Sequence, residues 1–193
     1  ALLISFLLGP YVINRLRDQH TQLYVDARAV TLTPYVAALP FLAEVAGEYW
    51  SPTYLVTKVS ADVDHPPFAP GVRLTTWNGV PFARQVDLYA ETLTGGRPDA
   101  RRARALETLT QRPLEFLPVP DELWVAVGYR PKERAEEAAD LTVRFRWRAI
   151  EPEKAMTAPS ATELRTRRAI DQTSEAARRA RKLLFQTDLW EHD

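Results

Sequence analysis

The side chains that could take part in hydrolysis are few and lie far apart in the sequence. Cysteine is absent, which excludes a thiolate nucleophile and a disulfide. The three histidines are His20, His65 and His192. The five serines are Ser5, Ser51, Ser60, Ser160 and Ser174. None of the serines lies in a glycine-rich turn between a strand and a helix, so the sequence offers no evident nucleophile.

His20 is the candidate general base. It lies in residues 16–21, Leu-Arg-Asp-Gln-His-Thr, where a helical pattern ends. An imidazole with a pKa of about 6.5 is largely neutral at neutral pH and can accept a proton from a hydroxyl. Asp18 or Thr21 could orient the ring. The alternative is that His20 braces a turn from helix to strand and has no catalytic role.

Metal and cofactor chemistry are not predicted. The three histidines form no His-x-x-x-His pair and have no carboxylate at ligand spacing, so we expect no zinc site. No glycine-rich loop that could cradle phosphate is present. We therefore predict no metal and no cofactor, and we interpret the basic run at residues 97–104 as a solvated helix face.

Length and charge narrow the class of protein. The chain has 193 residues, 46% of them hydrophobic, which suffices for a sizeable core. Lys and Arg together number 25, as do Asp and Glu, so the formal net charge is zero and we expect no nucleic-acid partner. The apolar opening at residues 1–8 is far shorter than the ~20 residues that a membrane span needs.

The order of predicted elements gives an α+β fold. Residues 4–17 have the apolar spacing of a helix, and residues 151–193 contain a linker followed by a basic amphipathic helix that opens with a capping box at residues 160–163. Between them lies a β-rich body. We therefore divide the chain into a helical N-terminal segment (1–33), a central domain (34–150) and a linker with a long basic helix (151–193).

The central domain combines strands with two short helices. Strands are predicted at residues 38–46, 54–59, 72–77, 125–129 and 141–150. Asn78-Gly79 predicts a two-residue turn because both residue types tolerate positive φ. A helix around Val86, Tyr89 and Leu93 is expected to end at Gly95-Gly96, and a second helix covers residues 99–110.

This order of elements resembles a PDZ domain, in the circularly permuted bacterial form. The resemblance rests on a strand at 54–59, Pro70-Gly71-Val72, a second strand, Trp77-Asn78-Gly79-Val80-Pro81 and a helix; Val72 stands where most PDZ domains have Asp. It implies a PDZ-like, partly open β-barrel or sheet with one or two helices. It also implies that an edge strand binds the C-terminal tail of a polypeptide by strand addition.

The PDZ resemblance carries over to particular positions. The loop that captures the carboxylate of the tail falls on Leu39-Pro40, the edge strand on residues 41–45 and the groove helix on residues 82–90. Pro40 departs from the pattern because proline has no N–H to donate. The candidate peptide-binding residues are Leu39, Phe41, Leu42, Val86 and Tyr89. The alternative is that these residues are core.

Four blocks resemble the C-terminal-processing (tail-specific, tricorn-core-like) serine peptidases. They lie at residues 16–21, 77–81, 101–114 and 120–125, and the similarity runs over residues 10–150. It implies that His20 is the base of a serine-type peptidase that acts on polypeptides. The serine and the glycine-rich oxyanion segment of this family follow a region like residues 151–193. We therefore expect this chain to be inactive alone, with the catalytic part of the same protein as its partner.

Two other functions fit the sequence. The chain could be a non-catalytic peptide-binding or scaffolding module whose helix at residues 160–186 docks onto a partner. It could also be a structural domain whose groove is filled by its own side chains. A homo-oligomer is compatible with either. The sequence does not decide between the bacterial cell envelope, secretion and the cytoplasm.

Overall fold

The computed structural model describes residues 35–48, 50–93, 97–114, 117, 119–132, 139–151, 180, 181, 184 and 185. The predictions for residues 1–33, including His20 and the N-terminal helix, lie outside these residues. Of the predicted C-terminal helix, only residues 180, 181, 184 and 185 are described, and they are helical. Among the described helices, none is long and apolar enough to cross a membrane.

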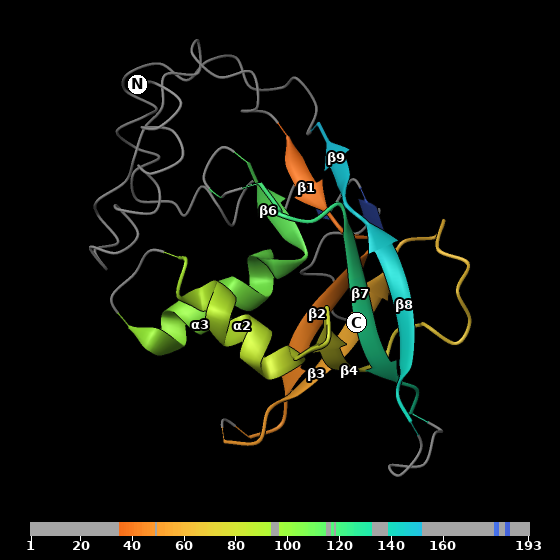
Figure 1. Ribbon diagram of the computed structural model, residues 1–193, viewed down its shortest axis with the longest axis horizontal. Coiled ribbons are helices and arrows are strands. Elements are labelled where there is room, and N and C mark those ends of the chain that lie inside the picture. The colour runs from red at the N-terminus through yellow and green to blue at the C-terminus, as the bar shows by residue number, and fades with distance from the viewer. Residues whose placement is uncertain are drawn as a thin grey trace.

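The predicted α+β class is confirmed (Figure 1). The strands are β1 (Val36–Ala38), β2 (Phe41–Ala46), β3 (Thr53–Val59), β4 (Arg73–Trp77), β5 (Val80–Pro81), β6 (Gln111–Pro113), β7 (Trp124–Arg130), β8 (Leu141–Arg146) and β9 (Arg148–Ile150). The helices are α2 (Phe82–Ala90) and α3 (Pro98–Leu109). The larger sheet has the order β2-β3-β4-β7-β8 with β5 paired to β4, and the smaller has the order β6-β1-β9. Within both sheets, all neighbouring strands pair antiparallel.

The turn after β4 forms as the sequence predicts. Asn78 and Gly79 both have positive φ, 49° and 80°, which is the backbone that a two-residue hairpin turn requires. The Asn78 side chain also accepts a hydrogen bond from the backbone N–H of Ala126 at 2.8 Å. This turn therefore reverses the chain into β5 and ties the end of β4 to β7.

The two helices lie together on one side of the larger sheet (Figure 1). Pro98 occupies the first turn of α3, where its missing N–H costs nothing, and Asp99 places a negative charge at the positive end of the helix. Helix α2 ends at Ala90, earlier than the glycines at 95 and 96. The backbone N–H and the hydroxyl of Thr92 both donate to the Tyr89 carbonyl, at 2.9 and 2.7 Å, and satisfy the helix end before the glycines are reached.

Aromatic side chains form the centre of the core. Phe41 of β2 lies against Phe68 and Phe145, with ring centroids 5.4 and 5.3 Å apart. Trp77 is 1% exposed. Its ring packs against that of Phe82, the first residue of α2, with ring centroids 6.1 Å apart. The core thus joins the sheet, the loop at residues 60–72 and helix α2.

The prediction of one continuous strand at residues 141–150 is wrong. The alternation holds in β8, where Val143 and Phe145 are buried and Arg144 is exposed. At Trp147 the chain leaves the larger sheet, and β9 then pairs with β1 in the smaller sheet. The backbone N–H of Trp147 donates to the Leu123 carbonyl at 3.1 Å, and its ring packs at 6.4 Å from that of Trp77. These contacts redirect the strand.

Replacement of Trp77 by Ala is expected to cost about 3–5 kcal/mol of unfolding free energy, because the cavity left in the aromatic core cannot collapse fully. The matched control is Trp50→Ala at a side chain that is 80% exposed, which should change stability by less than about 0.5 kcal/mol. Chemical denaturation followed by circular dichroism measures both. Equal effects of the two substitutions would contradict the described core.

Candidate functional site

Strand β2 is the candidate peptide-binding edge. Among the described residues it pairs with β3 alone, so its other side has no described strand partner. The preceding Leu39-Pro40 bend is fixed at two points. The Leu39 N–H donates to the Thr110 carbonyl and the Pro40 carbonyl accepts from the Ser60 N–H, both at 2.8 Å. An edge strand with free N–H and C=O groups can accept an extended peptide.

The helix beside β2 is α3, whereas the PDZ resemblance predicted that residues 82–90 would form the helix there. Helix α3 packs against β2 and β6, and α2 packs against β4 and β5. The reason is the short β6, which the sequence did not predict: it follows α3 directly and pairs with β1, so the end of α3 is held next to the Leu39-Pro40 bend. The sequence signal that could have placed α3 beside β2 is its apolar stripe of Ala105, Leu106 and Leu109, and the structure buries all three side chains.

The five predicted peptide-binding side chains are buried. Leu39, Phe41 and Val86 are 0% exposed, and Leu42 and Tyr89 are 4% and 5% exposed. Leu39, Phe41 and Leu42 lie at or next to the start of β2. Val86 and Tyr89 belong to α2, so the structure does not bring them beside this edge. Peptide binding by these residues stays a prediction.

The exposed part of the edge is its second half. Glu44, Val45 and Ala46 are all exposed, and Val45 has 55% of its surface in solvent. Glu44 accepts a hydrogen bond from the Thr57 hydroxyl of the neighbouring β3 at 3.4 Å. A peptide that adds to β2 would therefore meet a short, weakly apolar surface here, and most of its binding energy would come from backbone hydrogen bonds.

Of the two described serines, Ser60 has a carboxylate partner. Its hydroxyl donates to Asp62 at 2.5 Å, and Asp62 forms an ion pair with Arg148, also at 2.5 Å. The hydrogen bond from Ser60, with the hydrogen bond and charge of Arg148, holds the pKa of Asp62 below 3.8 despite some opposing burial. A carboxylate with a lowered pKa is a weak base, so this pair braces a loop and does not activate the serine.

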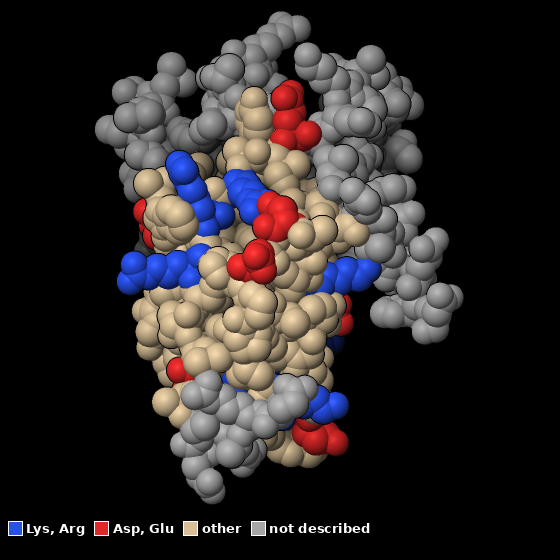
Figure 2. Space-filling model, turned by 90° about the vertical axis from the view of Figure 1, so that its right-hand side faces the viewer, with Lys and Arg blue, Asp and Glu red and all other residues tan. Residues whose placement is uncertain are grey.

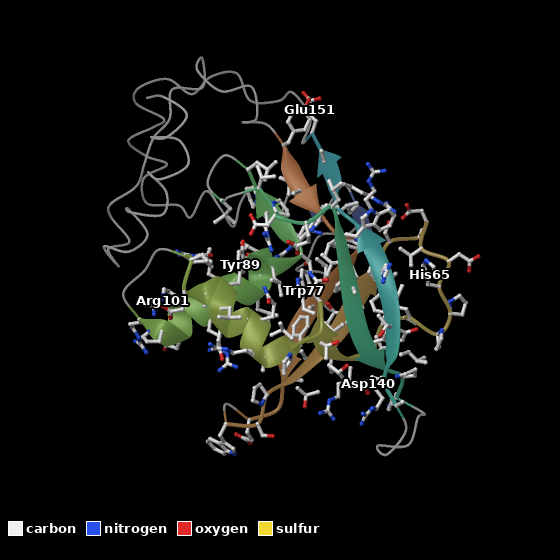
Figure 3. The ribbon with its side chains drawn as sticks, viewed as in Figure 1. His65, Trp77, Tyr89, Arg101, Asp140 and Glu151 are labelled. Atoms are coloured by element: carbon white, nitrogen blue, oxygen red, sulfur yellow. The ribbon has the colours of Figure 1, made fainter. Side chains whose placement is uncertain are left out.

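The described histidine, His65, lies far from the helices. Figure 3 shows it on the loop beyond β8, on the opposite side of the sheet from Tyr89 and Arg101. Its ring packs at 6.2 Å from that of Phe145. No group of three or more His, Cys, Asp or Glu side chains within the described residues could hold a metal ion.

A hollow of about 280 Å³ lies beside the start of α2, and among its lining residues are Arg73, Thr75, Arg130 and Asp140. Asp140 accepts two hydrogen bonds from Arg130, at 2.6 and 2.9 Å. Burial raises the pKa of Asp140, but the hydrogen bonds from Arg130 and the charges of Arg130 and Arg73 outweigh it, so the pKa lies below 3.8. The charge of Arg130 is thus paired with that of Asp140 within the protein. On the face of the molecule drawn in Figure 2, basic and acidic side chains are interspersed.

The fold is similar to that of a solved protein, mature CPAF. The crystal structure of mature CPAF, a chlamydial serine protease, superposes with a TM-score of 0.52 at 19% identity and covers 78% of this chain. The structure of mature CPAF complexed with lactacystin gives 0.49 at 17% identity, also over 78% of the chain. This chain covers 27% of the length of either structure. No family model and no curated protein matches the sequence.

Replacement of Ser60 by Ala is expected to raise the pKa of Asp62 towards 3.8, because the carboxylate loses its main hydrogen bond. A lowered folded-state pKa contributes stability above the unfolded pKa, and this contribution is lost as the pH falls through the folded-state pKa. In the variant, the contribution of Asp62 should therefore be smaller and should be lost at a higher pH during acid titration. NMR titration of the Asp62 carboxyl measures the shift, with Asp140 as the internal control. An unchanged Asp62 titration would show that the hydrogen bond does not form in solution.

Proposed function

We propose that this chain is the N-terminal and PDZ-like portion of a serine-type peptidase of the tail-specific class. In this proposal the PDZ-like domain at residues 34–150 binds the C-terminal tail of a polypeptide for proteolysis. The base at His20 acts on a serine supplied by a catalytic part of the same protein. The observation that carries the proposal is the fold similarity to mature CPAF across 78% of this chain.

Two further observations support the proposal. The Leu-x-Asp-x-His-Thr segment at residues 16–21 resembles the base-bearing segment of these peptidases. The β2 edge, the Leu39-Pro40 bend at its start and α3 beside it also support the proposal, because an edge strand, a bend and a flanking helix are what tail binding would use. In strand addition the backbone of the edge supplies the affinity, and the bend would receive the terminal carboxylate.

Tail binding is tested by titrating a fluorescent peptide with a hydrophobic, free C-terminus into this chain. Amidation of the C-terminus should abolish binding, because the carboxylate is then absent. N-methylation of alternate backbone amides should also abolish it, because the peptide can no longer pair with β2. Equal binding of all three peptides would rule out strand addition, and no binding of the free-acid peptide would leave the structural-domain alternative.

Replacement of Pro40 by Ala is expected to tighten tail binding about 5- to 10-fold. The substitution restores the backbone N–H that proline lacks, and a hydrogen bond to a charged group is worth about 1.5 kcal/mol or slightly less once backbone freedom is regained. The carbonyl of residue 40 still accepts from Ser60, so the bend is retained. An affinity equal to that of the unmodified protein would place the carboxylate elsewhere.

Activity is tested in the protein extended by its catalytic part. His20→Ala should abolish cleavage of an unstructured polypeptide there, while the melting temperature of the present chain changes by less than about 2 °C. The present chain alone should cleave nothing. A large fall in melting temperature would assign His20 a structural role. Serine-inhibitor-sensitive cleavage by the present chain would contradict the missing nucleophile.

A further inference from the structure

Arg112 is a buried cation with no carboxylate partner among the residues that the structure describes. It lies in the middle of β6, paired with Ala37 of β1, and is 7% exposed. Removing a guanidinium from water is costly unless an anion compensates for the lost hydration. Among the described residues, Arg101 is similarly buried at 8% exposed; its Nε–H also has no acceptor, but its charge is paired with Glu91 at 3.4 Å. Among the described residues, no carboxylate pairs with Arg112.

Two aromatic rings surround the Arg112 guanidinium. Its Cζ lies 4.6 Å from the ring centroid of Tyr89 and 4.9 Å from that of Trp147. The negative faces of the rings attract the cation and offset part of the cost of burial. They do not replace hydrogen bonds, however, because the Nε–H of Arg112 is buried with no acceptor.

The neighbouring groups cannot supply the missing acceptor charge. The indole Nε1–H of Trp147 is a second buried donor with no acceptor. Burial raises the pKa of Tyr89, and the charge of Arg112 opposes this only in part, so the phenol stays neutral at neutral pH. The buried Oε1 of Gln111 has no partner either, but successive side chains of a strand point to opposite faces, which directs it away from Arg112.

We propose that Arg112, Tyr89 and Trp147 form a receptor for one carboxylate carried by a polypeptide. The carboxylate accepts from the Nε–H of Arg112 and the indole N–H of Trp147, and its single charge balances that of the guanidinium. A dianionic phosphate would leave excess negative charge beside two aromatic rings, which disfavours it. The inference does not depend on the proposed peptidase function, because it rests on the burial and the unpaired donors of these residues alone.

The first experiment measures thermal unfolding while sodium chloride is exchanged for sodium acetate at constant ionic strength. Acetate that binds the folded state should raise the melting temperature by about 3 °C near tenfold saturation. The response should vanish in Arg112→Met, which keeps the aliphatic length and removes the charge, and should weaken in Trp147→Phe, which keeps a ring and removes the N–H. Arg144→Met, at an exposed arginine of β8, is the matched control and should respond as the unmodified protein does.

The outcomes separate the proposal from its alternatives. Without acetate, Arg112→Met should melt at or above the temperature of the unmodified protein, because it removes an uncompensated buried charge. A marked fall, or failure of this variant to fold, would show that the protein already supplies a counter-ion and would overturn the proposal. So would an acetate response that is absent from the unmodified protein or equal in Arg112→Met.

Two probes then identify the source of the carboxylate. N-acetylalanine carries a free α-carboxylate, as a C-terminus does, and N-acetylglutamate α-amide carries a side-chain carboxylate. Stabilisation by the first that requires Arg112 assigns the receptor to a chain terminus. Stabilisation by the second assigns it to an Asp or Glu side chain of a docked segment. Stabilisation by neither contradicts a polypeptide carboxylate.

Discussion

The contact between the two ends of the larger sheet holds the rest of the fold in place. Strands β2 and β8 are the first and last in the strand order, yet the rings of Phe41 and Phe145 lie 5.3 Å apart. The natural twist of a sheet brings its ends towards each other, and burial of aromatic surface between them fixes that curvature. Phe68 completes the contact from the loop at residues 60–72, with centroids 5.4 Å from Phe41 and 5.0 Å from Phe145.

This curvature determines which part of the edge is available. The start of β2 is drawn into the core, so Phe41, Leu42 and Ala43 are buried, and only Glu44, Val45 and Ala46 remain exposed. The smaller sheet adds a second constraint, because β6 joins the end of α3 to β1 and so sets the helix beside the Leu39-Pro40 bend. The same short strand places Arg112 between Tyr89 and Trp147. The candidate edge and the buried cation therefore share one structural support.

Much of the local structure could be predicted because it depends on neighbouring residues. A β-rich composition identified β3, alternating apolar and polar side chains identified β4 and β8, and Asn78-Gly79 identified the turn after β4. Asp99 marked the start of α3, whereas the predicted apolar stripe of Ala103, Leu106 and Leu109 was only partly right, because Ala103 is exposed. The burial of the candidate peptide-binding residues was less accessible to prediction. Phe41 and Tyr89 are apolar and regularly spaced, and that pattern is the same for a core residue as for a groove residue.

The sequence by itself determined the α+β class, most of the strands and the type of the tight turn, since backbone preference and apolar spacing act over a few residues. Only the tertiary structure decided that residues 141–150 divide between two sheets, that α3 and not α2 lies beside β2, and that Arg112 is enclosed by two rings. Each of these features depends on contacts between residues far apart in the chain. Their energies come from burial against partners that no local pattern specifies.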